Sequence, residues 1–293
     1  MSKQIQAREH EIGYVEIDRD VTLRSVAVRS TAPRAAALLL HGFPETIYAW
    51  TDIARALADD YDVHSFDWPG FGLSSRPPLD RFSYSPKDYA RVLKGFLDKT
   101  GIDRSKLTVY ATDISALPVL LLALEEPDFA KTLIVGDFAP FNRPALMWQN
   151  LQALKSKPSS DHVRAAMNAG RDEILQNTFF RGLPKEAHYD VPQEFRDDMA
   201  TAWSRDGMTV VDAFYHYYAS FTRDQDHFEA NLARLKTPVK VVWGSDDLYI
   251  TKDMGAELAE RIHAELNVLA GIGHYPHLQA PEQTIAEIRA ASR

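Results

Sequence analysis

The chain has 293 residues and a formal net charge of −8, with 45% hydrophobic and 25% charged residues. This length fits a single core domain that carries an inserted subdomain. The negative charge argues against nucleic acid or an anionic membrane as a partner, because both require a basic surface. No cysteine is present, which excludes disulfides, thiolate metal sites and cysteine nucleophiles.

The first part of the chain, Met1–Arg24, is charged throughout and lacks the apolar core of a signal peptide. No apolar run approaches the ~20 residues that a membrane-spanning helix needs. We therefore expect a cytoplasmic protein with no membrane partner.

Short apolar runs alternate with longer amphipathic stretches, which is typical of an α/β protein whose strands and helices surround a mostly parallel sheet. The apolar runs predict eight strands, at Tyr14–Ile17, Thr22–Val28, Ala36–Leu40, Val63–Phe66, Leu107–Ala111, Thr132–Val135, Lys240–Trp243 and Glu265–Leu269. The amphipathic stretches predict five helices, at Tyr48–Ala58, Pro86–Lys99, Ile114–Glu125, Lys252–His263 and Pro281–Ala291.

Residues 140–225 interrupt this alternation. The segment contains no convincing strand, many helix-forming residues, and repeated proline and glycine. We interpret it as a helical lid that covers the carboxyl edge of the sheet. The core domain then comprises residues 1–139 and 226–293.

The first motif is Leu39–Pro44, where a buried strand ends in a turn. A turn in this place can present a backbone N–H to a developing negative charge, and Phe43 would be that donor of an oxyanion hole. Taken alone, a His-Gly step such as His41-Gly42 is equally well a simple strand-end turn.

The second motif is Val109–Ala116, where a strand passes into a helix. Asp113 lies at this turn with the small residues Ala111 and Ser115 on either side, the pattern of a tight elbow that exposes a nucleophile. Aspartate also tolerates the positive φ that such a bend requires. The alternative is that Asp113 only caps the helix, and in isolation that interpretation is the stronger one.

The third motif is Gly271–His274, directly after the last predicted strand. A histidine on this flexible loop can reach the nucleophile across the edge of the sheet. His277 is the nearby competitor, but the Gly-His step favours His274. Nucleophile, acid and histidine would then follow one another in that order along the chain.

Two carboxylates are candidates for the acid that orients His274. Asp247 follows the Trp243-Gly244 step after the penultimate strand, and Asp137 follows the preceding strand. Only one is needed to orient the imidazole and stabilise its charge. We favour Asp247 and keep Asp137 as the alternative.

These motifs resemble the epoxide hydrolases of the α/β-hydrolase fold, and the resemblance covers most of the chain. Its matching segments are His41–Glu45 with Tyr48 and Trp50, Asp67–Ser74, and Gly273-His274 with Pro281-Glu282. The resemblance implies a mostly parallel eight-stranded sheet with a helical lid and Asp113 as the nucleophile, as in the related haloalkane and haloacetate dehalogenases.

In that family, lid tyrosines hold the epoxide oxygen. Phe214-Tyr215 resembles the site of the second tyrosine, so the resemblance assigns this role to Tyr215. No tyrosine matches the first site near Trp148–Leu154. The alternative interpretation of Tyr215, Tyr217 and Tyr218 is aromatic packing within the lid.

The elbow departs from the usual Gly-x-Asp-Trp-Gly of the family. Haloalkane dehalogenases typically place a tryptophan where this chain has Ile114, and many place asparagine where it has Phe43. Haloacetate dehalogenases use arginines just after the nucleophile, and Leu117 and Ile114 provide none. Their acid position matches Asp137, however, and Met147-Trp148 is similar to their lid. Dehalogenation therefore stays the second choice.

The expected reaction opens an epoxide to a vicinal diol. Asp113 forms an alkyl ester, Tyr215 protonates the leaving oxygen, and a water activated by His274 hydrolyses the ester. The backbone N–H groups of Phe43 and Ile114 hold the oxyanion. The partners are a small apolar epoxide or organohalide and water, with no metal or organic cofactor. The least favoured alternative is a hydrolase fold that binds a ligand without catalysis.

Overall fold

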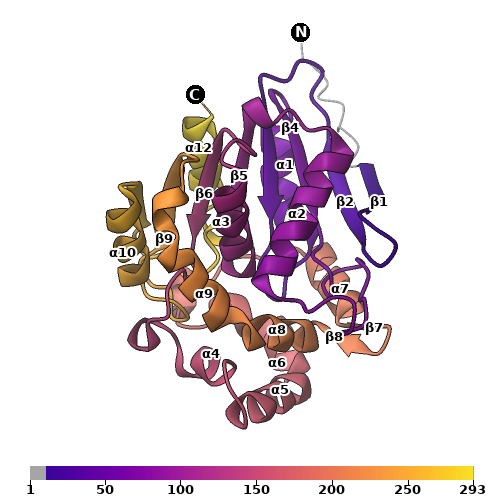
Figure 1. Ribbon diagram of the computed structural model, residues 1–293, viewed down its shortest axis with the longest axis vertical. Helices are drawn as coiled ribbons and strands as arrows, with labels where there is room; N and C mark the ends of the chain where they lie inside the picture. Colours follow the sequence, from indigo (N-terminus) through magenta and orange to yellow (C-terminus); the bar gives the residue numbers. More distant parts are fainter. Residues whose placement is uncertain (1–10, 293) are drawn as a thin grey trace.

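A computed structural model describes residues 11–292, in which eight strands form one sheet in the order β1-β2-β4-β3-β5-β6-β9-β10 (Figure 1). The strands are β1 Glu11–Glu16, β2 Thr22–Val28, β3 Ala35–Leu40, β4 Tyr61–Phe66, β5 Leu107–Thr112, β6 Thr132–Gly136, β9 Val239–Gly244 and β10 Glu265–Leu269. The pairs β1–β2 and β2–β4 are antiparallel, and all other pairs in this sheet are parallel. The predicted α/β class and mostly parallel sheet are confirmed.

The central strands are buried because helices cover both faces of the sheet. Every residue of β3 and of β5 is buried, as expected for continuous apolar strands of a parallel sheet. Figure 1 shows α2 and α3 in front of the strands and α1 and α12 behind them. The core helices are α1 Thr51–Leu57, α2 Pro86–Thr100, α3 Ala116–Glu125, α10 Lys252–Ile262, α11 Pro276–Gln279 and α12 Pro281–Ala291.

Local sequence explains where α2 begins and ends. The Ser85 side chain accepts a hydrogen bond from the Asp88 amide, and Pro86 occupies the first turn, where its missing N–H costs little. At the other end Gly101 adopts φ +65°, the left-handed conformation that glycine adopts readily. Short 3-10 helices complete the chain, at η1 Ile47–Trp50, η2 Arg104–Lys106, η3 Asp113–Ser115, η4 Pro144–Leu146, η5 Thr178–Phe180, η6 Lys185–Ala187 and η7 Leu232–Arg234.

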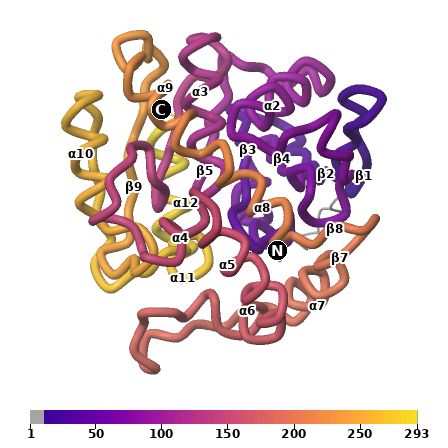
Figure 2. The backbone as a smooth tube through the Cα atoms, turned by 60° about the horizontal axis from the view of Figure 1, so that its bottom comes forward, coloured from indigo at the N-terminus to yellow at the C-terminus, as the bar shows by residue number. Residues whose placement is uncertain are grey.

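Between β6 and β9 the chain forms six helices that lie at one end of the sheet (Figures 1 and 2). They are α4 Gln149–Ala153, α5 Ser159–Ala169, α6 Arg171–Asn177, α7 Gln193–Ala202, α8 Val210–Ala219 and α9 Phe221–Ala230. The domain boundary predicted between residues 225 and 226 falls inside α9. This helix packs on α2 and α3 of the core.

This segment also contains a short hairpin that the sequence pattern did not predict. β7 Ser204–Arg205 pairs with β8 Met208–Thr209. The turn between them consists of Asp206 and Gly207, both with positive φ. An Asp-Gly pair in this conformation is typical of a two-residue hairpin turn. Two-residue strands have too little periodicity to be recognised from sequence.

Two buried arginines connect the core to the helical segment. Arg24 of β2 donates to Asp67 after β4, and both of its terminal nitrogens donate to Asp198 of α7 at 2.7 Å. Arg76 donates to the backbone carbonyls of Ala202 and Met208. These contacts fix the position of α7 and of the hairpin relative to the sheet.

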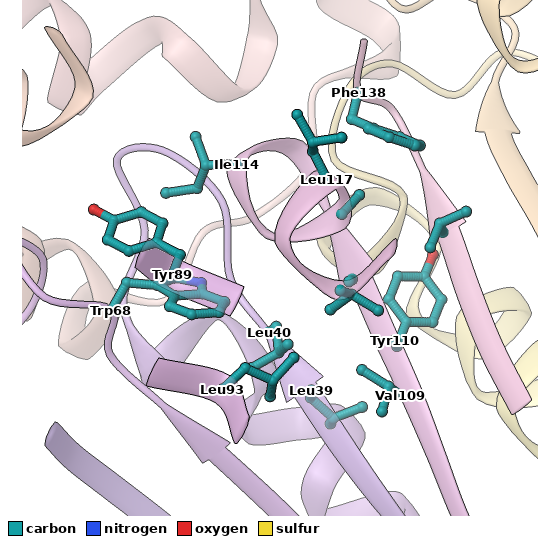
Figure 3. Close-up of a cluster of buried hydrophobic side chains, with 14 of the residues drawn as sticks. Leu39, Leu40, Trp68, Tyr89, Leu93, Val109, Tyr110, Ile114, Leu117 and Phe138 are labelled. Atoms are coloured by element: carbon teal, nitrogen blue, oxygen red, sulfur yellow. The ribbon is translucent and has the colours of Figure 1, made fainter. Parts of the chain in front are cut away.

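The interior beneath the carboxyl ends of β3 and β5 is filled with aromatic and aliphatic side chains. Figure 3 shows Ile114 and Leu117 in the same buried cluster as Trp68 and Tyr89. The rings of Trp68 and Tyr89 are stacked with centroids 5.0 Å apart. This packing supports the turn that follows β5. Within residues 11–292, no helix combines the length and apolar character needed to cross a membrane.

Candidate active site

The turn after β5 is a strained elbow built from small residues. Asp113 has φ +51°, and its neighbours Ala111 and Ser115 are completely buried. The Ser115 hydroxyl donates to the His41 carbonyl and accepts a hydrogen bond from the Trp68 indole at 2.7 Å. Both hydrogen-bonding functions of the Ser115 hydroxyl are thereby used inside the protein. The residue of this elbow that lines the cavity with an ionisable side chain is Asp113, the predicted nucleophile.

The loop after β3 approaches Asp113 so closely that it requires a glycine. A Cβ atom on Gly42 would lie 2.7 Å from the Asp113 Cβ, a distance that side chains do not tolerate. The next residue, Phe43, donates its backbone N–H to Oδ2 of Asp113 at 2.7 Å. The structure thus brings the predicted donor Phe43 against the predicted nucleophile. Ile114, the second predicted donor, is the residue that follows Asp113 and is buried.

His274 lies between two carboxylates. Its Nδ1 is 2.8 Å from Oδ2 of Asp247, and its Nε2 is 3.9 Å from Oδ2 of Asp113. Asp247 is itself oriented by hydrogen bonds from the backbone N–H groups of Tyr249 and Ile250. The imidazole therefore faces Asp113 with the nitrogen that Asp247 leaves free, which is the arrangement of a general base.

The charge state of His274 follows from these neighbours. Burial lowers the pKa of the imidazole, but the carboxylates of Asp247 and Asp113 outweigh burial and hold that pKa well above its usual value. The two carboxylates therefore favour the protonated form of the imidazole over the neutral one. The charge of Asp113 is part of what stabilises the protonated form.

Asp137, the alternative acid, lies beside the His274–Asp247 pair without bonding to the imidazole. Its Oδ1 accepts the backbone N–H of Gly244 at 2.9 Å. One ligand atom of each of Asp137, Asp247 and His274 lies within 4.8 Å of the others. This is the one cluster of that kind within residues 11–292 that could hold a metal ion, and it consists of the predicted histidine and both candidate acids.

The competing histidine, His277, lies in a separate buried contact. Its Nε2 is 2.7 Å from Oε1 of Glu45, and its ring stacks on Trp50 at a centroid distance of 4.4 Å. The contacts with His277 outweigh burial and lower the pKa of the Glu45 carboxyl. This pair joins the loop after β3 to α11, and neither residue lines the cavity above Asp113.

Tyr215 is not brought to the site. Its hydroxyl donates to Oδ1 of Asp161 at 2.7 Å, and the residue does not line the cavity that contains Asp113. Phe214, Tyr217 and Tyr218 of the same helix do line it. Helical geometry explains the difference, because positions three and four apart share a face and Tyr215 lies about 100° around the helix from Phe214. Helical periodicity in the sequence already places Tyr217 and Tyr218, and not Tyr215, on the face of Phe214. The assignment of Tyr215 from the family resemblance did not take this periodicity into account.

Tyr218 presents a free hydroxyl to the cavity. Among residues 11–292 no hydrogen-bond partner is found for this hydroxyl, whereas the Tyr217 hydroxyl donates to the Ile114 carbonyl at 3.0 Å. Burial, and then the negative charge of Asp113, raise the pKa of Tyr218 well above its usual value. Tyr218 is therefore a protonated donor in the same cavity as the Asp113 carboxylate.

The cavity above Asp113 has a volume of about 590 Å³ and mostly apolar walls. Trp148 also lines it, and no hydrogen bond to its indole N–H is found within the described part of the chain. The guanidinium of Arg181 lies 5.2 Å from the centroid of the Trp148 ring and donates to both carboxylate oxygens of Glu173. A cavity of this size and character fits a small or medium-sized apolar molecule.

Comparisons with known proteins identify the family of the chain. A family described as "alpha/beta hydrolase fold" matches residues 37–281, and the chain belongs to that family. It is 25% identical over 263 residues to the 2-hydroxy-6-oxononadienedioate/2-hydroxy-6-oxononatrienedioate hydrolase 2 of Pseudomonas putida, covering 84% of this chain and 83% of the relative. It is 34% identical over 123 residues to a fluoroacetate dehalogenase of Burkholderia sp, covering 41% of this chain and 39% of that protein.

Among solved structures, the epoxide hydrolase of Vigna radiata superimposes with a TM-score of 0.77 at 21% identity, covering 97% of this chain and 98% of that one. At this level of identity the likeness establishes the fold. The protein is therefore a hydrolase of the alpha/beta fold family.

Proposed function

We propose that the protein is an epoxide hydrolase that works through a covalent ester on Asp113. One observation carries this choice: the unpartnered Tyr218 hydroxyl shares a cavity with the Asp113 carboxylate and His274. Opening an epoxide creates a strongly basic alkoxide, so a proton donor beside the nucleophile is what this reaction needs. We expect a small, mainly apolar epoxide as the substrate, with water as the second reactant and no cofactor.

In the first step the Asp113 carboxylate attacks one carbon of the epoxide ring. A carboxylate is already ionised at neutral pH and needs no base for a displacement at saturated carbon. The new bond joins Asp113 to that carbon, the carbon–oxygen bond of the ring breaks, and the oxygen takes the proton of Tyr218. The intermediate is a hydroxyalkyl ester.

In the second step His274 acts as the base. Once Asp113 is esterified its charge is gone, and one of the two carboxylates that raise the pKa of His274 no longer does so. The imidazole loses its proton, which returns through solvent to the Tyr218 phenolate, and then removes a proton from a water that attacks the Asp113 carbonyl carbon. The N–H groups of Phe43 and Ile114 hold the tetrahedral oxyanion, and such a donor contributes about 3–4 kcal/mol. When this intermediate collapses, the ester carbon–oxygen bond breaks and the imidazolium protonates the oxygen of the departing diol. The Asp113 carboxyl group then gives its proton to His274, which restores the starting state.

Dehalogenation is the second candidate because of Trp148. Trp148 lines the cavity, its indole N–H has no partner among the described residues, and an N–H of this kind can hold a leaving halide. A dehalogenase would use the same ester on Asp113 but would not require the Tyr218 proton, since halide leaves as a stable anion. The partial match to a fluoroacetate dehalogenase gives this candidate further support.

The decisive experiment traps the ester. In His274→Gln we expect the first step to proceed and the second to stop, so intact mass spectrometry should show a gain equal to the mass of the epoxide. With a haloalkane the gain would be the mass of the alkyl group less one hydrogen, which identifies dehalogenation instead. Peptide mapping should place the adduct on Asp113.

The matched control is Asp113→Asn in the same His274→Gln background, in which no adduct should form. The substrate panel should contain epoxides, haloalkanes, haloacetates and a 2-hydroxy-6-oxodienoate. Wild-type cleavage of the dienoate without any adduct on Asp113 would contradict the proposal, as would an unmodified His274→Gln protein with every epoxide and halide.

A further inference from the structure

Asp137 is a buried carboxyl group that the proposed reaction does not use. Its side chain is 1% exposed. Oδ1 accepts the Gly244 N–H, but no partner is found for Oδ2 within the described residues. The backbone of Asp137 has φ +50°, a conformation that is uncommon outside glycine, asparagine and aspartate. A buried carboxyl oxygen without a partner is rare enough to require an explanation.

Two glycines bring Asp137 to this place. A Cβ on Gly136 would lie 1.7 Å from the Val242 carbonyl oxygen, and a Cβ on Gly244 would lie 2.1 Å from the Gly273 carbonyl oxygen. The ends of β6 and β9 and the histidine loop therefore approach more closely than side chains would allow. As a result, a carboxyl oxygen of Asp137 lies within 4.8 Å of both an oxygen of Asp247 and a ring nitrogen of His274.

The two carboxyl groups are unlike in their hydrogen bonds. Asp247 accepts two backbone N–H bonds, and its Oδ2 lies 2.8 Å from Nδ1 of His274. Asp137 accepts a single backbone bond. Burial, and next the charge of Asp247, raise the pKa of Asp137 well above its usual value. Both causes favour the protonated form of Asp137.

We propose that Asp137 is a positioning residue that holds a proton beside Asp247 and serves as a reserve partner for His274. The proton resides on the Asp137 carboxyl group, whose Oδ2 has no partner among the described residues, and an oxygen of Asp247 lies within 4.8 Å of one of its oxygens. If Asp247 loses its charge, Asp137 ionises and takes over the orientation of the imidazole. This inference rests on the proposed function, because it concerns the histidine that hydrolyses the Asp113 ester.

The proposal makes opposite predictions for two asparagine variants. Asparagine has the shape of a protonated aspartic acid and can donate an N–H to Asp247, and it also tolerates the positive φ at this position. Asp137→Asn should therefore slow turnover less than a substitution that cannot hydrogen-bond. In Asp247→Asn burial still raises the pKa of Asp137, but the charge of Asp247 no longer does and the charge of His274 lowers it. The ionised Asp137 should therefore support ester hydrolysis at a reduced rate.

The test is single-turnover kinetics of ester formation and ester hydrolysis in Asp137→Asn, Asp247→Asn and the double variant, with an epoxide from the panel. Ester formation should persist in all three. Ester hydrolysis should be slow but measurable in Asp247→Asn and at least tenfold slower in the double variant, close to His274→Gln. Asp137→Leu, which fills the site but cannot hydrogen-bond, should be slower than Asp137→Asn.

A spectroscopic readout tests the proton directly. Infrared difference spectra between wild type and Asp137→Asn should contain the C=O band of a protonated carboxylic acid, shifted in D₂O. The ionisable groups facing Asp137 are Asp247, His274, Asp113 and Tyr110, and none of these is altered in that comparison.

Two results would overturn the inference: equal hydrolysis rates in Asp247→Asn and the double variant, or the absence of the carboxylic acid band. Neither would affect the proposed function, provided the ester still forms. Conversely, the absence of ester in every variant would contradict the proposed function, while the infrared band would still report on Asp137.

Discussion

The tyrosines of α8 show how one residue position decides whether a hydroxyl is available for chemistry. Tyr215 donates to Asp161 outside the cavity, and Tyr217 donates to the Ile114 carbonyl. Tyr218 lines the cavity with no partner found among the described residues. Three neighbouring hydroxyls thus have three different uses, and only one is free to protonate a substrate oxygen.

We expect Tyr218→Phe to slow the opening of an epoxide by about 10²–10⁴-fold, because the leaving alkoxide loses its proton donor. The measurement is the rate of ester formation in rapid-quench experiments with the His274→Gln background. Tyr215→Phe is the matched control and should leave that rate unchanged. Equal rates in Tyr218→Phe and Tyr215→Phe would remove Tyr218 from the mechanism.

At the scale of elements, the site depends on the close approach of the loop after β3 to the elbow after β5. These strands are parallel neighbours in the sheet, so their carboxyl ends lie side by side. Gly42 permits the contact, and the N–H of Phe43 reaches Asp113 as a result. The proposed oxyanion donor and the proposed nucleophile are therefore placed by the register of two strands.

Gly42→Ala should reduce kcat by about 100-fold, since its Cβ would lie 2.7 Å from the Asp113 Cβ and displace the nucleophile. Steady-state kinetics with the best epoxide of the panel would measure this loss. Gly13→Ala, where a new Cβ meets nothing within 4 Å, is the control and should retain full activity. Wild-type kcat in Gly42→Ala would show that the approach is not required.

At the scale of the whole molecule, the helices between β6 and β9 complete the cavity and must be held against the sheet. Arg24 makes this connection from β2 through Asp67 and Asp198. Asp67 is fully buried and also accepts the backbone N–H groups of Ile47 and Leu73. The arginine thus neutralises a carboxylate that the fold has already enclosed.

Arg24→Met should lower the free energy of unfolding by about 3 kcal/mol or more, because it leaves the buried Asp67 charge without its partner. Urea denaturation followed by circular dichroism would measure this change. Arg19→Met, which removes an exposed pair with Asp20 whose arginine is 80% exposed, should have no measurable effect. An unfolding midpoint for Arg24→Met equal to that of Arg19→Met would contradict this account.

What the sequence by itself determined is the set of local features. Continuous apolar runs predict the buried strands of a parallel sheet, and all eight predicted strands are present within residues 11–292. The small residues around Asp113 and the glycines before Phe43 and His274 mark the three turns at the carboxyl ends of these strands. Such signals are readable because the backbone conformation of a turn restricts the residues that can occupy it.

What only the tertiary structure decided is how side chains from distant segments meet. The sequence offered both Asp247 and Asp137 to His274, and the packing of β6, β9 and the histidine loop placed one in a hydrogen bond and the other beside it. Helical periodicity groups Phe214, Tyr217 and Tyr218 on one face, but which face of α8 covers Asp113 depends on how the helix docks. Periodicity is a property of one segment, whereas orientation is set by the free energy of packing all segments together.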